Sequence, residues 1–226
     1  MVGQYDCFER SWVSGKGRTA VWRYNNGHPA SACQPQFLAP PRADSRSRIA
    51  ICDVTSATNT RTVLATWVPQ DWSCGNTAPV LVFESDSQAL AGLAVLNSLI
   101  FDWQARRIVS GLHLNRFYLE AMCWPRLEKC DIQTLVECAL ALLNHVPRFA
   151  ELAPAELVDG SGRRDYVELH LTIERTVARG FGLNEADLKR VYSSDTRDRR
   201  GFWRDFARDP HAATVAAQAL AHPVVA

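Results

Sequence analysis

The stretch that decides the fold is Arg48-Ile-Ala-Ile-Cys-Asp-Val54, followed by Thr55-Ser-Ala-Thr-Asn-Thr60 and Arg61-Thr-Val-Leu-Ala-Thr-Trp-Val68. The first and last segments are rich in apolar and β-branched residues, whereas the run between them is mostly polar. Two such segments joined by a short polar connection predict a β-hairpin. A third apolar run, Ala78 to Phe83, is predicted to form another short strand.

Helical spacing replaces the strand pattern after Ser87. Apolar residues then recur at steps of three and four, which predicts one helix that ends at Arg106 and Arg107. The apolar residues on one face of this helix are Leu90, Leu93, Leu96, Ile100 and Trp103. Further helices are predicted over about 131–146, over 165–179 with a stop at Gly180-Phe-Gly182, over 184–192 with Asn184 as its cap, and after Pro210.

The segment before residue 48 gives weaker signals. Strands are predicted at 8–13 and 19–24, and the run 28–47, rich in Pro, Ser and Arg, is predicted to be a loop or extended arm. The chain is therefore predicted to have an α+β fold. We expect a β-rich domain with packed helices over 1–127, in which 1–40 has no assigned role, and a mostly helical subdomain over 128–226.

Bulk composition excludes several classes of protein. No apolar run approaches the roughly 18–20 residues that a membrane-spanning helix needs. The seven cysteines are scattered and none stands in a Cys-x-x-Cys pair, so we expect reduced thiols in a cytoplasmic protein and neither a disulfide framework nor a zinc site. The net charge of +1 is unlike that of a free-standing nucleic-acid binder, which is usually strongly basic.

Four blocks occur in the order found in a known family: Arg48 to Ala65, Cys74 to Phe83, Leu96 to Arg107, and Gly111 to Glu120. Together they resemble the carboxy-terminal target-recognition region of Type IIG restriction–modification enzymes and their BREX-type phage-defence relatives. In that family one chain carries an adenine methyltransferase and a specificity module. The resemblance covers about 45–125 and continues more loosely through 179–188. It implies a DNA target-recognition module whose partners are double-stranded DNA and a methyltransferase domain or subunit.

The family's catalytic signatures are absent from this sequence. An adenine methyltransferase of the family needs a glycine-rich turn and a polar residue followed by Pro-Pro and an aromatic residue. The only Pro-Pro lies in Ala39-Pro-Pro-Arg42, and Gly15-Lys-Gly17 is not followed by a helix pattern. The family's nuclease motif and a Gly-x-Ser-x-Gly elbow are also missing. We therefore expect no catalytic centre, metal or cofactor here, and S-adenosylmethionine would belong to the missing catalytic domain.

Candidate DNA contacts fall into two segments, together with Arg48 at the start of the first strand. The first segment is the polar hairpin connection. The alternative to a DNA contact there is a solvated loop whose side chains hydrogen-bond to their own backbone. The second follows the helix end, and there the alternative is helix capping by arginine and a turn held by Asn115. Resemblance and side-chain chemistry together nominate Arg48, Thr55, Thr58, Asn59, Arg61, Arg106, Arg107, His113, Asn115 and Arg116.

The roles expected within this set differ. Arg61 lies in the family's shared block, so it is expected to bind phosphate, whereas His113, Asn115 and Arg116 are better placed to contact bases. Four nearby apolar residues are expected in the core rather than as wedges between bases: Phe101, Trp103, Leu112 and Leu114. Two other functions stay open, an inactive remnant or protein-interaction module of the same fold, and an enzyme whose site escapes detection. The base sequence and the oligomeric state do not follow from the sequence.

Overall fold

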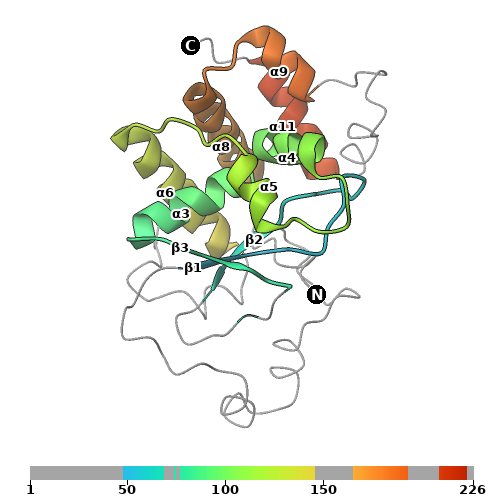
Figure 1. The fold of residues 1–226 in the computed structure, drawn as a ribbon. Helices are drawn as coiled ribbons and strands as arrows, with labels where there is room; N and C mark the ends of the chain where they lie inside the picture. The colour runs from blue at the N-terminus through green and yellow to red at the C-terminus, as the bar shows by residue number, and fades with distance from the viewer. Residues whose placement is uncertain (1–47, 69–73, 75–76, 146–164, 193–208, 223–226) are drawn as a thin grey trace.

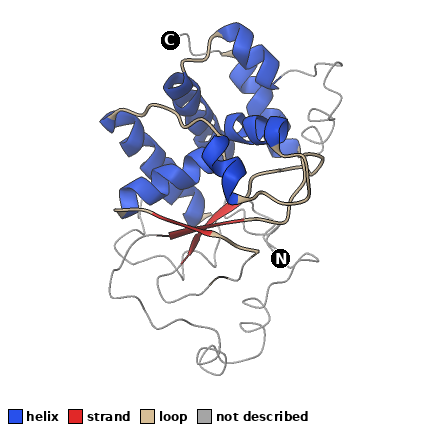
Figure 2. Cartoon of the chain, in the orientation of Figure 1, coloured by secondary structure: helices blue, strands red, loops and turns tan. Residues whose placement is uncertain are grey.

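The computed structural model describes residues 48–68, 74, 77–145, 165–192 and 209–222. The strands predicted at 8–13 and 19–24 and the arm at 28–47 lie outside these ranges. Within them a three-stranded antiparallel sheet and seven helices form an α+β fold, as the sequence predicted. Figure 2 shows the helices gathered on one side of the sheet.

The sheet has the strand order β2-β1-β3, with β1 (Arg48–Ile51) between β2 (Ala65–Val68) and β3 (Val80–Val82). The predicted hairpin is confirmed, because β1 and β2 pair antiparallel. Alternation along β1 sends Ile49 and Ile51 into the core shared with the helices, while Ala50 joins a small apolar cluster on the other face. The sheet therefore has a helix-covered face and a second apolar face.

The single helix predicted after Ser87 is wrong, because the chain forms two: α3 (Asp86–Leu96) and α4 (Leu99–Ile108). At the break, the Asn97 side chain pairs with the backbone of Ala65, with Oδ1 accepting from its N–H and Nδ2 donating to its carbonyl, both at 3.0 Å. Ser98 then starts α4 by accepting from the N–H of Phe101 at 3.2 Å. The edge of β2 thus ends α3 and fixes the start of α4.

The remaining helices follow the predicted signals, except for α5 (Arg116–Ala121), which was not predicted. Asp165 caps α8 by accepting from the N–H groups of Val167 and Glu168, and Gly182 ends it in the left-handed region at φ 65°. Asn184 accepts from the N–H of Asp187 at 3.0 Å at the start of α9. The bounds are α6 Lys129–Asn144, α8 Tyr166–Phe181, α9 Glu185–Tyr192 and α11 Pro210–Ala221.

One apolar core joins the sheet to the helices, whose arrangement on one side of the sheet Figure 1 shows. It runs from β1 and β2 through α3 to α6, α8 and α11, so it contains residues from both sides of the domain boundary predicted between 127 and 128. Helix α3 lies in the middle of this core, and every residue from Ala89 to Leu96 is buried. A Cβ at Gly92 would lie 2.8 Å from Cζ of Phe83, which shows how closely the Phe83 ring packs against α3. The sheet, α3 and α4 therefore form a rigid support for the segments between them.

Candidate nucleic-acid interface

A buried ion-pair cluster holds the β1–β2 connection, residues 52–64, against α4. The Asp102 carboxylate accepts hydrogen bonds from the backbone N–H groups of Thr62 and Val63, at 2.7 and 2.8 Å. It also accepts from Nε of Arg106 at 2.8 Å, and Nε of Arg61 lies 3.6 Å away. We call Arg61, Asp102 and Arg106 the Asp102 cluster. The fully buried carboxylate is tolerated because charged and backbone donors surround it.

Both arginines of the Asp102 cluster also bind main-chain carbonyls. Arg106 donates to the carbonyls of Ala57 and Thr60, at 3.0 and 2.5 Å, which ties the connection to α4. Arg61 donates to the carbonyl of Asn97 at 2.6 Å, beside the break between α3 and α4. The exposed fraction of the side chain is 1% for Arg106 and 10% for Arg61. The cluster therefore builds the scaffold.

Three predicted DNA contacts are corrected by this geometry. A DNA contact needs a side chain that reaches solvent, whereas Arg106 and Thr55 are buried and Arg61 is nearly so. Thr55 Oγ1 donates inward, to the carbonyl of Thr62 at 2.8 Å. The sequence placed these residues on a polar connection and at a helix end, but it did not show that Asp102 draws the arginines into the core.

Two segments far apart in sequence meet beside this scaffold. Residues 53–55 and 112–114 form a short antiparallel ribbon, in which Val54 pairs with His113. The N–H of Leu114 donates to the carbonyl of Asp53 at 2.6 Å, and the N–H of Thr55 donates to the carbonyl of Leu112 at 3.0 Å. We call these residues the ribbon. It brings together the two predicted contact segments, which the sequence alone did not join.

The exposed polar candidates lie on the ribbon and at the ends of the helices beside it. His113, Asn115, Arg116 and Arg107 are all exposed, whereas Leu114 is fully buried. The Arg107 guanidinium stacks over the ring of Trp103, with 4.6 Å to the centroid. Arg116 Nε donates to Glu120 at 2.7 Å, an exposed pair of the kind that contributes little to stability. Arg116 can therefore exchange this contact for a phosphate.

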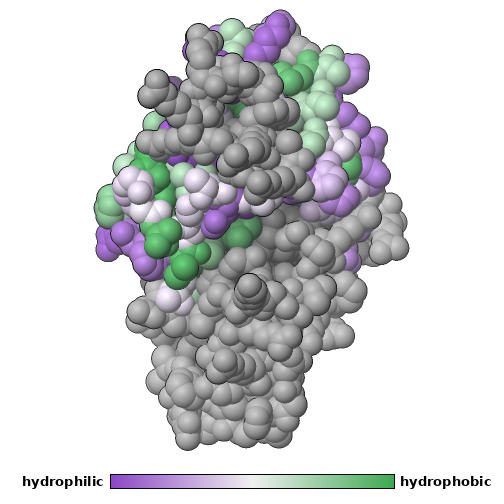
Figure 3. Space-filling view, turned by 90° about the vertical axis from the view of Figure 1, so that its right-hand side faces the viewer, coloured by the Kyte–Doolittle hydropathy of each residue, from purple (hydrophilic) through white to green (hydrophobic). Residues whose placement is uncertain are grey.

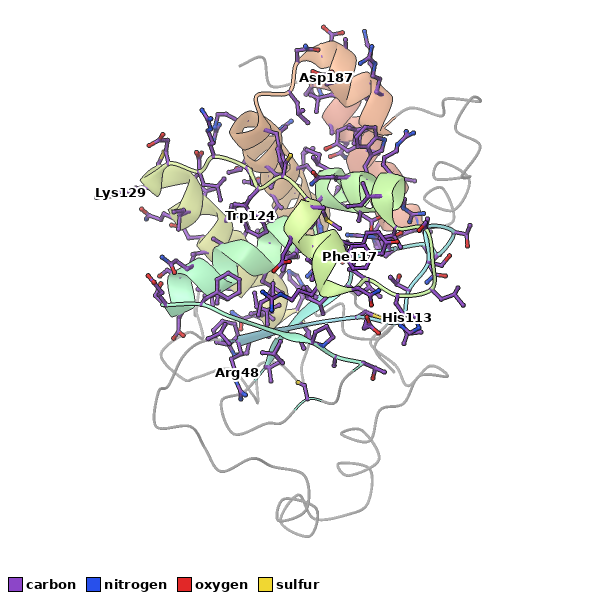
Figure 4. All side chains as sticks on the ribbon, viewed as in Figure 1. Arg48, His113, Phe117, Trp124, Lys129 and Asp187 are labelled. Atoms are coloured by element: carbon purple, nitrogen blue, oxygen red, sulfur yellow. The ribbon has the colours of Figure 1, made fainter. Side chains whose placement is uncertain are left out.

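The other predicted contacts are less well placed. Thr58 and Asn59 are exposed, but Thr58 Oγ1 lies 2.9 Å from Ser56 Oγ and Asn59 Nδ2 lies 3.4 Å from Thr55 Oγ1. Their contacts within the loop match the solvated-loop alternative. Arg48 stands at the opposite end of β1 from His113 (Figure 4). Arg48 and Val54 are six positions apart in sequence, which corresponds to about 20 Å of extended chain, so Arg48 is not part of the ribbon.

Apolar side chains share the ribbon surface. Val54, Leu112 and Phe117 are exposed to 48%, 69% and 57%. The expectation that Leu112 lies in the core is therefore wrong, whereas Leu114 and Phe101 are buried as expected. Figure 3 views the molecule from the right-hand side of Figure 1 and shows hydrophobic and hydrophilic residues side by side over the described part of that face. Along the ribbon itself, the exposed apolar side chain of Leu112 is next to the exposed polar side chain of His113.

Asp53 belongs to this surface, and sequence reasoning missed it. Its Oδ2 lies 2.7 Å from Nδ1 of His113, with the two side chains 15% and 54% exposed. Asp53 lies in the first of the four sequence blocks on which the expected resemblance rests, and His113 lies in the last. No spacing along the chain pairs the two residues, because only the fold brings them together. The block membership of Asp53 was the one signal that pointed to it.

Beneath the interface, a buried carboxylate fixes the start of α4. Glu174 of α8 accepts from the N–H groups of Leu99 and Ile100, at 2.5 and 3.3 Å, and from the hydroxyl of Tyr192 at 2.7 Å. Burial raises the pKa of Glu174 to about 6, while the hydrogen bonds from Leu99 and Tyr192 oppose that rise. Glu174 holds the amino end of the helix whose other end carries Arg107.

Among the described residues, no group of three or more His, Cys, Asp or Glu side chains is arranged to hold a metal ion. Of the helices that the structure describes, none is both long and apolar enough to cross a membrane. No protein-family model, curated protein or solved structure matches this chain.

Proposed function

We propose that this chain is a DNA target-recognition module that positions an adenine-specific methyltransferase of a restriction–modification or phage-defence system on its site. Its support in the sequence is the ordered resemblance over about 45–125. The observation that carries the proposal is the ribbon, since Val54 and His113 pair and so join the two segments that the resemblance nominated. The module acts in the cytoplasm, and a partner domain or subunit binds S-adenosylmethionine.

The exposed side chains divide into two kinds of contact in this proposal. Arg107 at the end of α4 and Arg116 at the start of α5 carry charge, bind phosphates and set the register on the duplex. This role revises the base contact that the sequence favoured for Arg116, whose side chain is 89% exposed at the helix start. His113 and Asn115 offer donors and acceptors to base edges in the major groove. The Asp102 cluster supports both kinds of contact by holding α4 against the β1–β2 connection.

Binding to a randomised duplex pool at two salt concentrations tests the proposal. We expect enrichment of one sequence and binding that weakens with salt, because phosphate contacts release counterions. Arg107→Ala and Arg116→Ala should each weaken binding to all sequences and lower the salt slope by about one. Arg190→Ala is the matched control, since its side chain is 76% exposed on α9, the helix that carries Asp187, and Figure 4 shows Asp187 far from His113. A wild-type chain that neither enriches a sequence nor binds in a salt-dependent way contradicts the proposal.

A protein-interaction module is the second candidate, and the exposed Val54, Leu112 and Phe117 favour it. Apolar residues at the centre of a protein interface are commonly surrounded by polar ones, as these are. Leu112→Ser separates the two functions. Two results together would favour the second candidate. Leu112→Ser would lose a methyltransferase partner in size-exclusion chromatography without DNA, and neither the wild type nor Leu112→Ser would bind duplexes.

A further inference from the structure

The contact between Asp53 and His113 fixes which imidazole nitrogen carries a proton. The ionised carboxylate can only accept, so the 2.7 Å contact between Asp53 Oδ2 and His113 Nδ1 places an N–H on Nδ1. In the neutral ring, Nε2 is then a hydrogen-bond acceptor. The backbone of Asp53 is held on both sides, by the carbonyl of Thr77 at 3.2 Å and the N–H of Leu114 at 2.6 Å. The carboxylate is therefore anchored on the scaffold.

Because Asp53 contacts Nδ1, the Nε2 edge of the His113 ring is the edge left for a ligand. Asp53 is 15% exposed and covers the Nδ1 edge, while the His113 side chain is 54% exposed. Leu114 points into the core, so His113 and Asn115 flank it on the outer side of an extended chain. Asn115 precedes α5, but its side chain makes no capping hydrogen bond to that helix. The helix therefore does not fix the orientation of the Asn115 amide. The two side chains stand about 6.7 Å apart along the chain, near two base-pair steps.

We propose that Asp53 is a specificity-determining positioning residue, which makes His113 select a base with an exocyclic amino group in the major groove. The inference rests on the proposed function, because it assigns a base class to the same surface. Adenine N6 and cytosine N4 are the donors that an acceptor Nε2 can bind. Guanine and thymine present carbonyl oxygens in the corresponding region, and two facing acceptors repel each other. Asn115 adds an amide that suits adenine N6 and N7 at a position about two base pairs away.

Asp53→Asn tests the role of the carboxylate while keeping the shape of the side chain. The Asn amide can donate to Nδ1, and it no longer enforces the N–H on that atom. His113 is then free to carry its proton on Nε2 and to donate to guanine or thymine. We expect the wild type to bind a duplex with adenine or cytosine at this position about 10-fold more tightly than one with guanine or thymine. Asp53→Asn should abolish or reverse that preference.

The measurement combines pool selection, fluorescence anisotropy on duplexes that differ at the selected position, and imidazole nitrogen NMR of the folded protein. His113→Gln serves as a second variant that leaves Asp53 in place, and its amide should bind both classes of base alike. Arg116→Ala should weaken all duplexes equally. Thermal unfolding of each variant shows that it is folded. The NMR spectra should place the proton of the neutral wild-type ring on Nδ1.

The outcomes separate the two proposals. A wild type that binds DNA specifically while Asp53→Asn and His113→Gln keep its base preference overturns this inference and leaves the proposed function standing. Spectra with the neutral wild-type proton on Nε2 overturn the inference as well. A wild type without DNA binding overturns both proposals. Variants that lose stability but keep the base preference would show that the contact between Asp53 and His113 only stabilises the ribbon.

Discussion

Replacing Arg106 with methionine should destabilise the protein strongly, although Arg106 lies in a segment first nominated for DNA contact. The substitution keeps most of the side-chain volume but removes the 2.8 Å bond to Asp102 and the donors to Ala57 and Thr60. Breaking a buried ion pair on one side costs about 3–5 kcal/mol. Arg61 stays, with its Nε 3.6 Å from the same carboxylate, so we expect the lower end of that range, about 3 kcal/mol.

Urea unfolding followed by circular dichroism measures this loss as a lower midpoint at an unchanged slope. The matched control is Arg116→Met, which breaks an exposed i,i+4 pair of the same kind and should cost less than about 0.5 kcal/mol. In a double-mutant cycle with Asp102→Asn, the double variant should lose at least about 1 kcal/mol less than the sum of the single losses. If Arg106→Met costs no more than Arg116→Met, the structural role assigned to the Asp102 cluster is wrong.

Three further predictions concern pH, thiols and backbone conformation. Burial raises the pKa of Glu174 to about 6, so the contribution of this group to stability is complete below about pH 4.5 and is lost as pH rises through 6. Chemical denaturation should show that the free energy of unfolding of Glu174→Gln, compared with that of the wild type, rises by about 2 kcal/mol between pH 4.5 and 7. Parallel plots of unfolding free energy against pH for the two proteins would contradict this. In the native protein, Cys123 and Cys130 are exposed and should be alkylated before the buried Cys52, whose pKa burial raises to about 12; peptide mass spectrometry that finds Cys52 modified first would refute the order. Gly182→Ala should cost about 1 kcal/mol in thermal unfolding, because the position has φ 65°, and an unchanged midpoint would count against this strain.

The features that the sequence predicted well depend on neighbouring residues. The hairpin follows from two β-branched runs, and β1 pairs with β2 as expected. The ends of α8 follow from Asp165 and from Gly182 in the left-handed region, which are local signals at known offsets. Pro210 opens α11 for the same reason, since its fixed φ suits the first turn.

The features that the sequence missed depend on contacts across the fold. Asn97 breaks the predicted helix because the edge of β2 offers it the backbone of Ala65, a partner 32 residues away. Arg106 turns inward because Asp102 and two loop carbonyls satisfy it there, whereas composition favours an exposed arginine. The partner of His113 is Asp53, 60 residues earlier. One sequence does not show which distant residues contact each other. The sequence therefore predicted which segments form the candidate site, but not how their side chains are arranged.

The ribbon also determines when this surface forms during folding. Its two sides are separated by about 60 residues that include β2, β3, α3 and α4, so its hydrogen bonds have high contact order and close a long loop. The amide protons of Thr55 and Leu114 should therefore exchange only when most of this region opens. Transfer of the surface to another protein requires residues 48–121 as one block, because a shorter graft separates each side of the ribbon from its partner.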